Sequence, residues 1–314
     1  MRYDHIEKQS NPYSLKSIGI VSTFSAAYLL LSVLLVGFKT DQVFLVVLVN
    51  ALYYSSGATR RFILGFLIFI VFWIIFDYMK IIPNYLVNDV HIKDLYLREK
   101  SLFGINEGGA VITPNEYFDR HSTTFLDVLS GSFYLNWVPI PLLFAAYLFR
   151  KDKSLFLQFS LSFLFVNLIG FVVYYLYPAA PPWYVKEYGF DLIFNTPGHT
   201  GALSRFDDFF GIKVFSSLYS KSSNVFAAMP SLHSSYPVIV FYYGLKKKLG
   251  FMNVFFFIFM TGIWFSAVYT SHHYVQDVIA GALCAVTGLF FFQQVLMKQQ
   301  WFLVFMKRYQ RLIS

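Results

Sequence analysis

Eight apolar runs dominate this sequence, and their length limits what the chain can fold into more than any other feature. A helix needs roughly 17 to 25 apolar residues to cross a bilayer, and several of the runs reach that length. Because 57% of the 314 residues are hydrophobic and only 13% are charged, a water-soluble core could not hide them. The sequence therefore predicts an all-α, polytopic transmembrane helix bundle. The candidate spans are residues 17–38, 43–54, 62–79, 133–149, 155–177, 234–245, 251–269 and 274–297.

The second and sixth runs are short for a membrane span, so we use the distribution of charged residues to decide whether each of them crosses the membrane. Basic residues favour the cytoplasmic side of a membrane. If all eight runs cross, one side holds 15 of the 25 basic and 3 of the 17 acidic residues, a net charge of +12, and the other side has a net charge of −4. This asymmetry predicts about eight spans with both termini in the cytoplasm. The basic side comprises residues 1–16, 58–61, 150–154, 246–250 and 298–314.

No internal repeat or break in composition divides the chain, so residues 1–314 are predicted to form a single integral membrane domain. The excess of basic residues follows from the sidedness, and no nucleic-acid partner is expected because no soluble segment has a basic face with interleaved aromatic residues. Cys284 is the single cysteine, lies in an apolar run and can form no intramolecular disulfide. The polar residues 1–17 do not resemble a cleavable signal, so the first span is expected to be retained.

Two long connections, 80–132 and 178–231, fall on the outer side, where long loops on a rigid scaffold usually carry function. Residues 91–105 alternate apolar and charged side chains at helical spacing. This pattern predicts an amphipathic helix along the membrane surface, which either grips a lipid head group or only caps the structure. In the second connection, Trp183 and Tyr184 follow a run of prolines and suit the head-group layer.

Residues with catalytic chemistry lie at the starts of the sixth and eighth runs. Pro230 and Ser231 are typical of a helix start, where serine caps free amides and the helix dipole favours an anion such as phosphate. His233 then falls in the first turn. His273 and Asp277 are four residues apart and so share one helix face, on which the carboxylate can orient the imidazole and stabilise its cation.

These groups match the needs of phosphoryl transfer from a lipid: a nucleophile, a proton donor, and positive charge or amides for the phosphoryl oxygens. His273, oriented by Asp277, is the expected nucleophile and forms a phosphohistidine. His233 is expected to protonate the leaving group and then to deprotonate the acceptor. An isolated histidine at a membrane surface is usually structural, but two on one side of the membrane, one with an aspartate partner, favour catalysis.

The phosphoryl oxygens are expected to be held by amides at Ser231 together with Arg205 or Lys221. His272 faces elsewhere on the helix, and we interpret it as orienting the substrate or as structural. A metal site built from the histidines and Asp277 is an alternative. No metal or other cofactor is expected, however, because no further cysteine or carboxylate cluster completes a coordination shell.

The pattern Pro-Ser-Leu-His233, followed by Ser266-x6-His273-x3-Asp277, resembles the second and third motifs of the type-2 phosphatidic acid phosphatase superfamily. The general forms of these motifs are Pro-Ser-Gly-His and Ser-Arg-x5-His-x3-Asp. Here Leu232 replaces the glycine, Ala267 replaces the arginine, and the first motif, Lys-x6-Arg-Pro, is missing. These departures argue against an ordinary phosphatase of the superfamily.

The same departures are similar to those of one branch, the inositol phosphorylceramide synthases. The similarity covers roughly a third of the chain and is carried by YPAAPPWY at 177–184, GALSRFD with GI at 201–212, PSLHS at 230–234 and TSHHY at 270–274. It implies a fold core at about 133–297 and a triad of His233, His273 and Asp277 on the non-cytoplasmic face. The activity it implies is transfer of phosphoinositol from phosphatidylinositol to ceramide or dihydroceramide, with release of diacylglycerol. The partners are then membrane lipids, and the oligomeric state stays open.

Two other functions remain as alternatives: a lipid phosphate phosphatase with water as acceptor, and a transporter. Transporters place ionisable groups near the bilayer midplane and contain repeats, whereas these groups gather at one face. For a transferase, Trp183, Tyr184 and the apolar residues Val225, Phe226 and Met229 are expected to exclude water from the intermediate. The short C-terminus favours a bacterial inner membrane with the site facing the periplasm over a Golgi membrane with the site facing the lumen.

Overall fold

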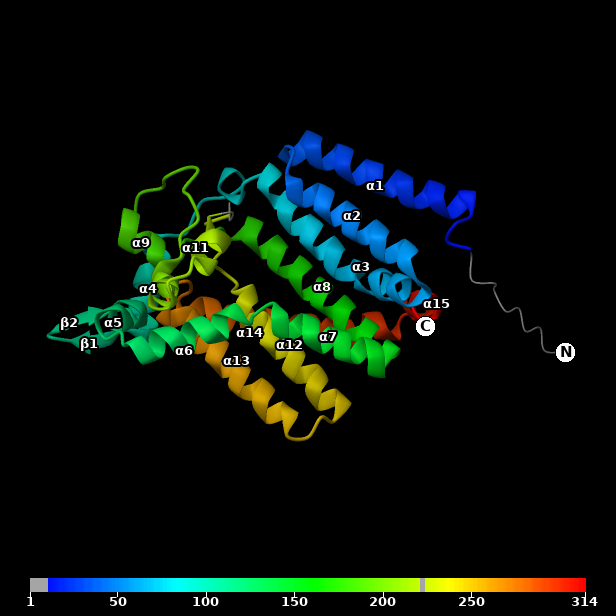
Figure 1. Ribbon diagram of the computed structural model, residues 1–314. Helices are drawn as coiled ribbons and strands as arrows, with labels where there is room; N and C mark the ends of the chain where they lie inside the picture. The colour runs from blue at the N-terminus through cyan, green and yellow to red at the C-terminus, as the bar shows by residue number, and fades with distance from the viewer. Residues whose placement is uncertain (1–10, 221–223) are drawn as a thin grey trace. The chain divides into compact units, whose positions relative to one another are not determined.

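The computed structural model describes residues 11–220 and 224–314. Helices make up nearly all of the regular structure in these residues, which confirms the all-α prediction (Figure 1). The chain divides into two compact units. One comprises the residues up to Ile81 together with Arg308–Ser314, and the other comprises Ile82–Lys307. We describe each unit by itself.

The first unit is built from three successive helices, α1 (Leu15–Val36), α2 (Thr40–Ser55) and α3 (Gly57–Tyr78), followed by the short η1 (Met79–Ile81). α2 packs against both α1 and α3. Serine side chains start two of these helices, because the Ser14 and Ser56 hydroxyls accept from backbone amides of the first turn. The end of α15 (Gln300–Leu312) belongs to this unit and is fixed to it by the Tyr309 hydroxyl, which donates to the Leu64 carbonyl at 2.7 Å.

The second unit contains the longer helices of the predicted fold core. In chain order these are α6 (Thr124–Leu135), α7 (Pro139–Lys151), α8 (Lys153–Leu176), α12 (Leu232–Lys247), α13 (Met252–Tyr269) and α14 (Val275–Gln294), which η4 (Leu296–Lys298) follows. α12 packs against α8, α13 and α14 (Figure 1). The close approach of α14 requires Gly281, because any side chain there would collide with the backbone carbonyl of Ser231. The two helices that carry the predicted catalytic motifs are thereby in direct contact.

Among residues 11–220 and 224–314, five helices are long and apolar enough to cross a membrane by themselves, which makes the chain a polytopic membrane protein. They are α1, Gly57–Ile81, α8, α13 and Val275–Lys298. α2 and α12, the two short runs, form helices of 16 residues each. The run predicted as a span over 133–149 covers the end of α6 and most of α7, which pass together as one broken span with a bend of 40°. Pro139 and Pro141 explain the break, since proline has no amide hydrogen to donate to the preceding turn and is tolerated only at a helix start. The total of eight crossings stays a prediction.

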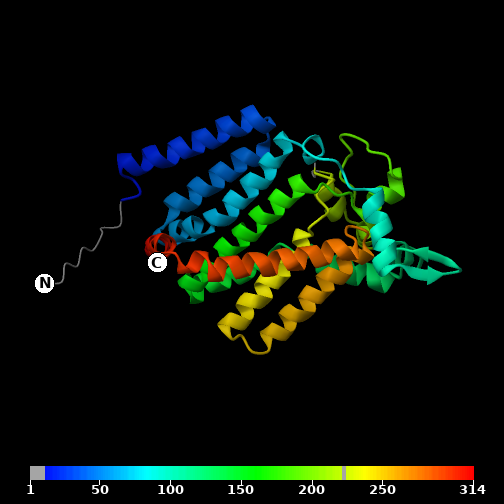
Figure 2. The ribbon, with the colours of Figure 1, turned by 180° about the vertical axis from the view of Figure 1, so that it is seen from behind.

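The two long outer connections fold into short elements at one end of the second unit (Figures 1 and 2). The first contains η2 (Asn84–Leu86), α4 (Lys93–Phe103), the hairpin of β1 (Ile105–Glu107) and β2 (Ala110–Ile112), and α5 (Pro114–Arg120). The second contains α9 (Pro182–Tyr188), η3 (Gly201–Leu203), α10 (Ser204–Phe210) and α11 (Val214–Tyr219). The helix predicted over 91–105 is confirmed as α4. Its side chains Leu95 and Glu99 are fully buried, so one face of α4 packs on protein.

Candidate active site

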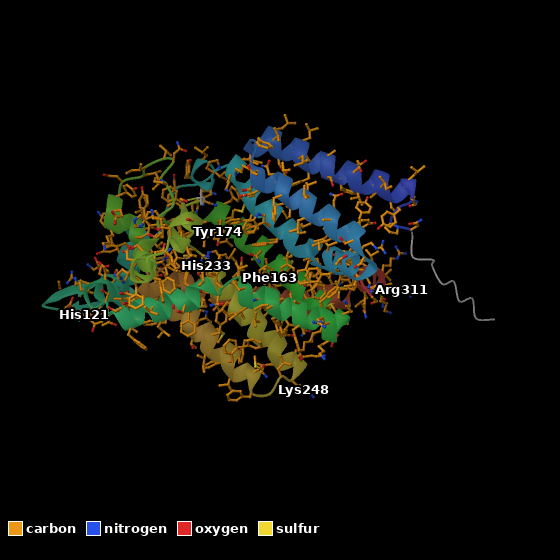
Figure 3. The ribbon with its side chains drawn as sticks, in the orientation of Figure 1. His121, Phe163, Tyr174, His233, Lys248 and Arg311 are labelled. Carbon is orange, nitrogen blue, oxygen red and sulfur yellow. The ribbon has the colours of Figure 1, made fainter. Side chains whose placement is uncertain are left out.

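Ser231 starts α12 as predicted. Its hydroxyl accepts from the backbone amide of Ser234 at 3.3 Å, and its own amide donates to the carbonyl of Asp277 at 3.0 Å. The first of these bonds caps the helix, and the second ties the two catalytic motifs together. His233 therefore lies in the first turn of α12, and Lys248 marks the opposite end of that helix (Figure 3).

A tight turn between α13 and α14 presents His273. The backbone amides of His272 and His273 both donate to the Ala267 carbonyl, at 3.1 and 3.0 Å, and Ser271 has the left-handed φ of +60° that this turn requires. His273 consequently precedes α14, whose N-cap is Tyr274, and only Asp277 lies within the helix. The expected pairing of His273 with Asp277 thus arises across a helix cap rather than along one helix face.

The three residues of the predicted triad lie in a row. Nδ1 of His233 is 3.2 Å from Nε2 of His273, and Nδ1 of His273 is 3.7 Å from Oδ2 of Asp277. The second distance is that of an ion pair and exceeds a hydrogen bond. Asp277 is fully buried, and its Oδ2 also accepts from the Tyr274 amide at 2.8 Å. Burial lowers the pKa of His273 to about 4, so its imidazole is neutral at pH 7 and holds a lone pair for nucleophilic attack.

Two aromatic residues that the sequence patterns did not single out contact His233. The hydroxyl of Tyr134 lies 3.1 Å from Nδ1 of His233, and the Trp137 ring meets the imidazole edge to face at 4.3 Å. Both come from the α6–α7 bend, about a hundred positions before His233 in the chain. No local signal could have found them, because each is one aromatic residue in an apolar run.

His272 points into an aromatic cluster instead of toward Asp277. Its ring centroid lies 5.2 Å from that of Tyr134 and 4.7 Å from that of Tyr219, and its Nδ1 is 3.1 Å from the Thr270 hydroxyl. Burial lowers the pKa of His272 well below its usual value, so the ring is neutral. Its Nε2 is buried and has no hydrogen-bond partner among the described residues.

Arg205, one of the two expected phosphate ligands, is engaged by carboxylates. Its Nε donates to Asp127 at 2.7 Å and its Nη1 to Asp119 at 3.3 Å, while the guanidinium lies over the Tyr269 ring. The buried Nη2 has no hydrogen-bond partner in the described part of the chain and is the nitrogen left for a ligand. Lys221, the other candidate, lies outside the described residues.

Trp183 is buried, with 5% of its surface exposed, and Tyr184 is fully buried, so the structure does not present them as an exposed aromatic belt. The backbone amide of Trp183 donates to the Ser271 carbonyl at 3.0 Å, and its ring packs beside His199 at 5.1 Å. Trp183 therefore contacts the turn that presents His273.

The first outer connection also holds this turn and the start of α14. The Asn115 side-chain amide donates to the carbonyls of Val268 and His273 at 2.8 and 2.9 Å. The Glu99 carboxylate accepts from the amides of Val275 and Gln276 at 2.9 and 3.3 Å, and burial raises the pKa of Glu99 to about 7. The α4 pattern placed Glu99 on a helix, but nothing in the sequence linked either residue to His273.

Within residues 11–220 and 224–314, no group of three or more histidine, cysteine, aspartate or glutamate side chains is arranged to hold a metal ion. The arrangement does fit histidine chemistry. An uncharged imidazole with a buried carboxylate at one nitrogen faces a second imidazole at the other, which is the pairing of nucleophile and proton carrier that covalent phosphoryl transfer uses.

Comparison with known proteins identifies the family of this chain. Residues 112–291 match the PAP2 superfamily. The chain is 43% identical to the phosphoinositol dihydroceramide synthase of Bacteroides thetaiotaomicron over 96% of its length and 99% of that protein. It is 29% identical to the inositol phosphorylceramide synthase of Candida albicans over 63% of this chain and 41% of that protein, and 29% identical to the catalytic subunit of the Saccharomyces cerevisiae enzyme over 62% and 47%. No solved structure matches the chain. This protein therefore belongs to the PAP2 superfamily, in the branch that contains the inositol phosphorylceramide synthases.

Proposed function

We propose that this protein transfers phosphoinositol from phosphatidylinositol to ceramide or dihydroceramide, giving inositol phosphorylceramide and diacylglycerol. One observation carries the proposal: Nε2 of His273 faces Nδ1 of His233 at 3.2 Å while Asp277 lies at the opposite nitrogen. The names of the similar proteins, a phosphoinositol dihydroceramide synthase and inositol phosphorylceramide synthases, support the choice of substrates.

In the first half-reaction, Nε2 of His273 attacks the phosphorus of phosphatidylinositol. The bond from phosphorus to the diacylglycerol oxygen breaks, and His233 gives its Nδ1 proton to that oxygen. Burial and the neighbouring His273 lower the pKa of His233 to about 3 before substrate binds, so His233 carries this proton only beside the anionic phosphodiester. Asp277 stabilises the positive charge that develops on His273. The products of this step are diacylglycerol and a phosphoinositol group bound to His273.

In the second half-reaction, the hydroxyl of ceramide attacks the phosphorus and the phosphorus–nitrogen bond breaks. His233, now neutral, takes the hydroxyl proton on Nδ1, so both histidines return to their starting states. Inositol phosphorylceramide leaves, and no proton is gained or lost over the cycle.

The phosphoryl oxygens need hydrogen-bond donors in both steps. We assign this role to the backbone amides in the first turn of α12, which follows the Ser231 cap, and to Arg205, whose Nη2 has no hydrogen-bond partner among the described residues. Lys221 is assigned as a second cation. Trp183 and His272 are assigned to the walls that exclude water, because both are buried beside the His273 turn.

A phosphatase that uses water as acceptor is the second candidate, and acceptor dependence separates the two. Purified protein in mixed micelles of phosphatidylinositol should release diacylglycerol slowly, and the rate should rise steeply with ceramide while inositol phosphorylceramide forms in equal amount. His273→Ala should abolish both. Equal release of diacylglycerol and free inositol phosphate with and without ceramide would replace the transferase with a hydrolase.

We also propose that the site faces the non-cytoplasmic side, in a bacterial inner membrane toward the periplasm more readily than in a Golgi membrane toward the lumen. The predicted spans leave a net charge of +12 on one side of the membrane and −4 on the side of the site, and this difference supports the orientation. The bacterial relative, which the chain matches over nearly its full length, supports the bacterial alternative.

A further inference from the structure

Tyr134 is a fully buried tyrosine with its hydroxyl at the proton carrier of the site. That hydroxyl lies 3.1 Å from Nδ1 of His233, the same nitrogen that lies 3.2 Å from Nε2 of His273. An imidazole nitrogen carries either one proton or one lone pair, so Nδ1 cannot form a full hydrogen bond with both neighbours at once. The partner of Nδ1 must therefore change as the reaction proceeds.

The covalent intermediate decides which partner remains. When His273 is free, its Nε2 and Nδ1 of His233 share one proton. Once Nε2 is bonded to phosphorus it has no lone pair to accept a hydrogen bond and no proton to donate. His233 has by then given its Nδ1 proton to the leaving diacylglycerol, so Nδ1 holds a lone pair and needs a donor. The Tyr134 hydroxyl is the nearest side-chain donor to it among the described residues.

We infer that Tyr134 is a positioning residue for the second half-reaction. Its hydroxyl donates to the Nδ1 lone pair of His233 in the phosphohistidine state, which keeps the remaining imidazole proton on Nε2. The lone pair then faces the phosphorus, where the ceramide hydroxyl arrives and takes over the hydrogen bond to Nδ1. The inference rests on the proposed transfer to ceramide, and it assigns Tyr134 to the step in which His233 acts as a base.

The packing contacts of Tyr134 are made by its ring, so the role of its hydroxyl can be tested separately. The ring belongs to a buried cluster with Leu203, Phe206 and Phe215, and it lies 5.2 Å from the His233 ring. Phenylalanine keeps all of these ring contacts and removes only the hydroxyl, with its contact to His233 and its hydrogen bond to the Tyr219 side chain. Without that donor, the His233 ring is free to take the other tautomer, with its proton on Nδ1, in which the nitrogen facing phosphorus cannot accept a proton.

The experiment is a pre-steady-state comparison of wild type and Tyr134→Phe, with diacylglycerol release and inositol phosphorylceramide formation followed together. The variant should form diacylglycerol in a burst of about one equivalent and then turn over roughly tenfold or more slowly than wild type, with KM for both lipids within about twofold. The burst is the readout that a packing defect would not produce, since loss of folded protein lowers both steps alike.

Tyr236→Phe is the matched control. Tyr236 is also buried, and its hydroxyl donates to Oδ1 of Asn167 at 2.7 Å, a hydrogen bond that does not involve His233. It should show no burst and a kcat close to wild type. A Tyr134→Phe kcat within twofold of wild type, or a slower rate without a burst, would overturn the inference. Wild type that forms no inositol phosphorylceramide would instead overturn the proposed function.

Discussion

The side-chain amide of Asn115 donates to the backbone carbonyl of His273 at 2.9 Å, across 158 positions of the chain. The same amide donates to the Val268 carbonyl at 2.8 Å, so it spans the turn that presents His273. Asn115 is 3% exposed and sits in the first turn of α5. The first outer connection, for which the sequence left open a lipid contact or a structural cap, thus contacts the catalytic turn directly.

Replacing Asn115 with alanine should lower kcat about tenfold or more and leave KM nearly unchanged. Loss of both hydrogen bonds frees the carbonyl of His273, and a displacement of about 1 Å at a reacting group can cost on the order of 10²-fold. Asn88→Ala is the control, because Asn88 lies in the same connection and donates to the Tyr175 carbonyl at 2.6 Å. Equal losses of kcat in the two variants would show that the connection acts only through folding.

Arg205→Ala should lower kcat by about 10²-fold, the usual effect of removing one donor to a developing negative charge. Arg120→Ala should have little effect, since Arg120 is exposed and pairs with Glu107. Arg205 also neutralises Asp127, so the double variant Arg205→Ala/Asp127→Asn separates the two roles. The double variant should recover the thermal stability that Arg205→Ala loses, but it should not recover the activity. Recovery of activity would mean that Arg205 serves only to pair Asp127.

Local patterns predicted the parts of the site that local geometry fixes. Ser231 caps α12 because its hydroxyl bonds an amide of the next turn, and His273 lies near Asp277 because the two are four residues apart across the start of α14. The approach of His233 to His273, 40 positions away, depends instead on the packing of α12 against α13 and α14. The break between α6 and α7 was not predicted, although Pro139 at the start of α7 explains it.

The residues that escaped prediction act across the chain. Tyr134 reaches His233 over 99 positions, and Glu99 reaches Val275 over 176. Each is an ordinary residue in its own segment, and only tertiary packing brings it to the site: that of α6 for Tyr134 and that of the first outer connection for Glu99. Spacing along the sequence carries no information about such contacts.

The pH dependence of the reaction should reflect the burial of His273. Burial lowers the pKa of His273 from 6.5 to about 4, because the charged imidazole is poorly solvated. Protonation occupies the attacking lone pair, so kcat/KM for phosphatidylinositol should fall as the pH drops through about 4 and not through 6.5. The profile of kcat/KM is measured from pH 8 down to pH 4 on protein that remains folded. A fall in kcat/KM centred near pH 6.5 would contradict the lowered pKa of His273.

The orientation of α12 can be tested by labelling single cysteines with a membrane-impermeant maleimide. At about 1.5 Å per residue, the 16 residues of α12 span about 24 Å, less than the roughly 30 Å hydrocarbon core. The lysines in its last turn, Lys246 and Lys247, can extend their charged ends to the surface and make up the difference. We therefore expect α12 to cross, with His233 outside and Lys247 in the cytoplasm.

In a background without the native cysteine, Cys284→Ala, a cysteine in place of Glu187 should react in intact cells. Glu187 is an exposed residue of α9, in the second outer connection. A cysteine in place of Lys247 should react only after the membrane is permeabilised. Because α12 alone joins that connection to Lys247, the two sites fall on opposite sides only if this short helix is a full span. Reaction of both cysteines in intact cells would place Lys247 on the outer side and remove α12 from the eight predicted crossings.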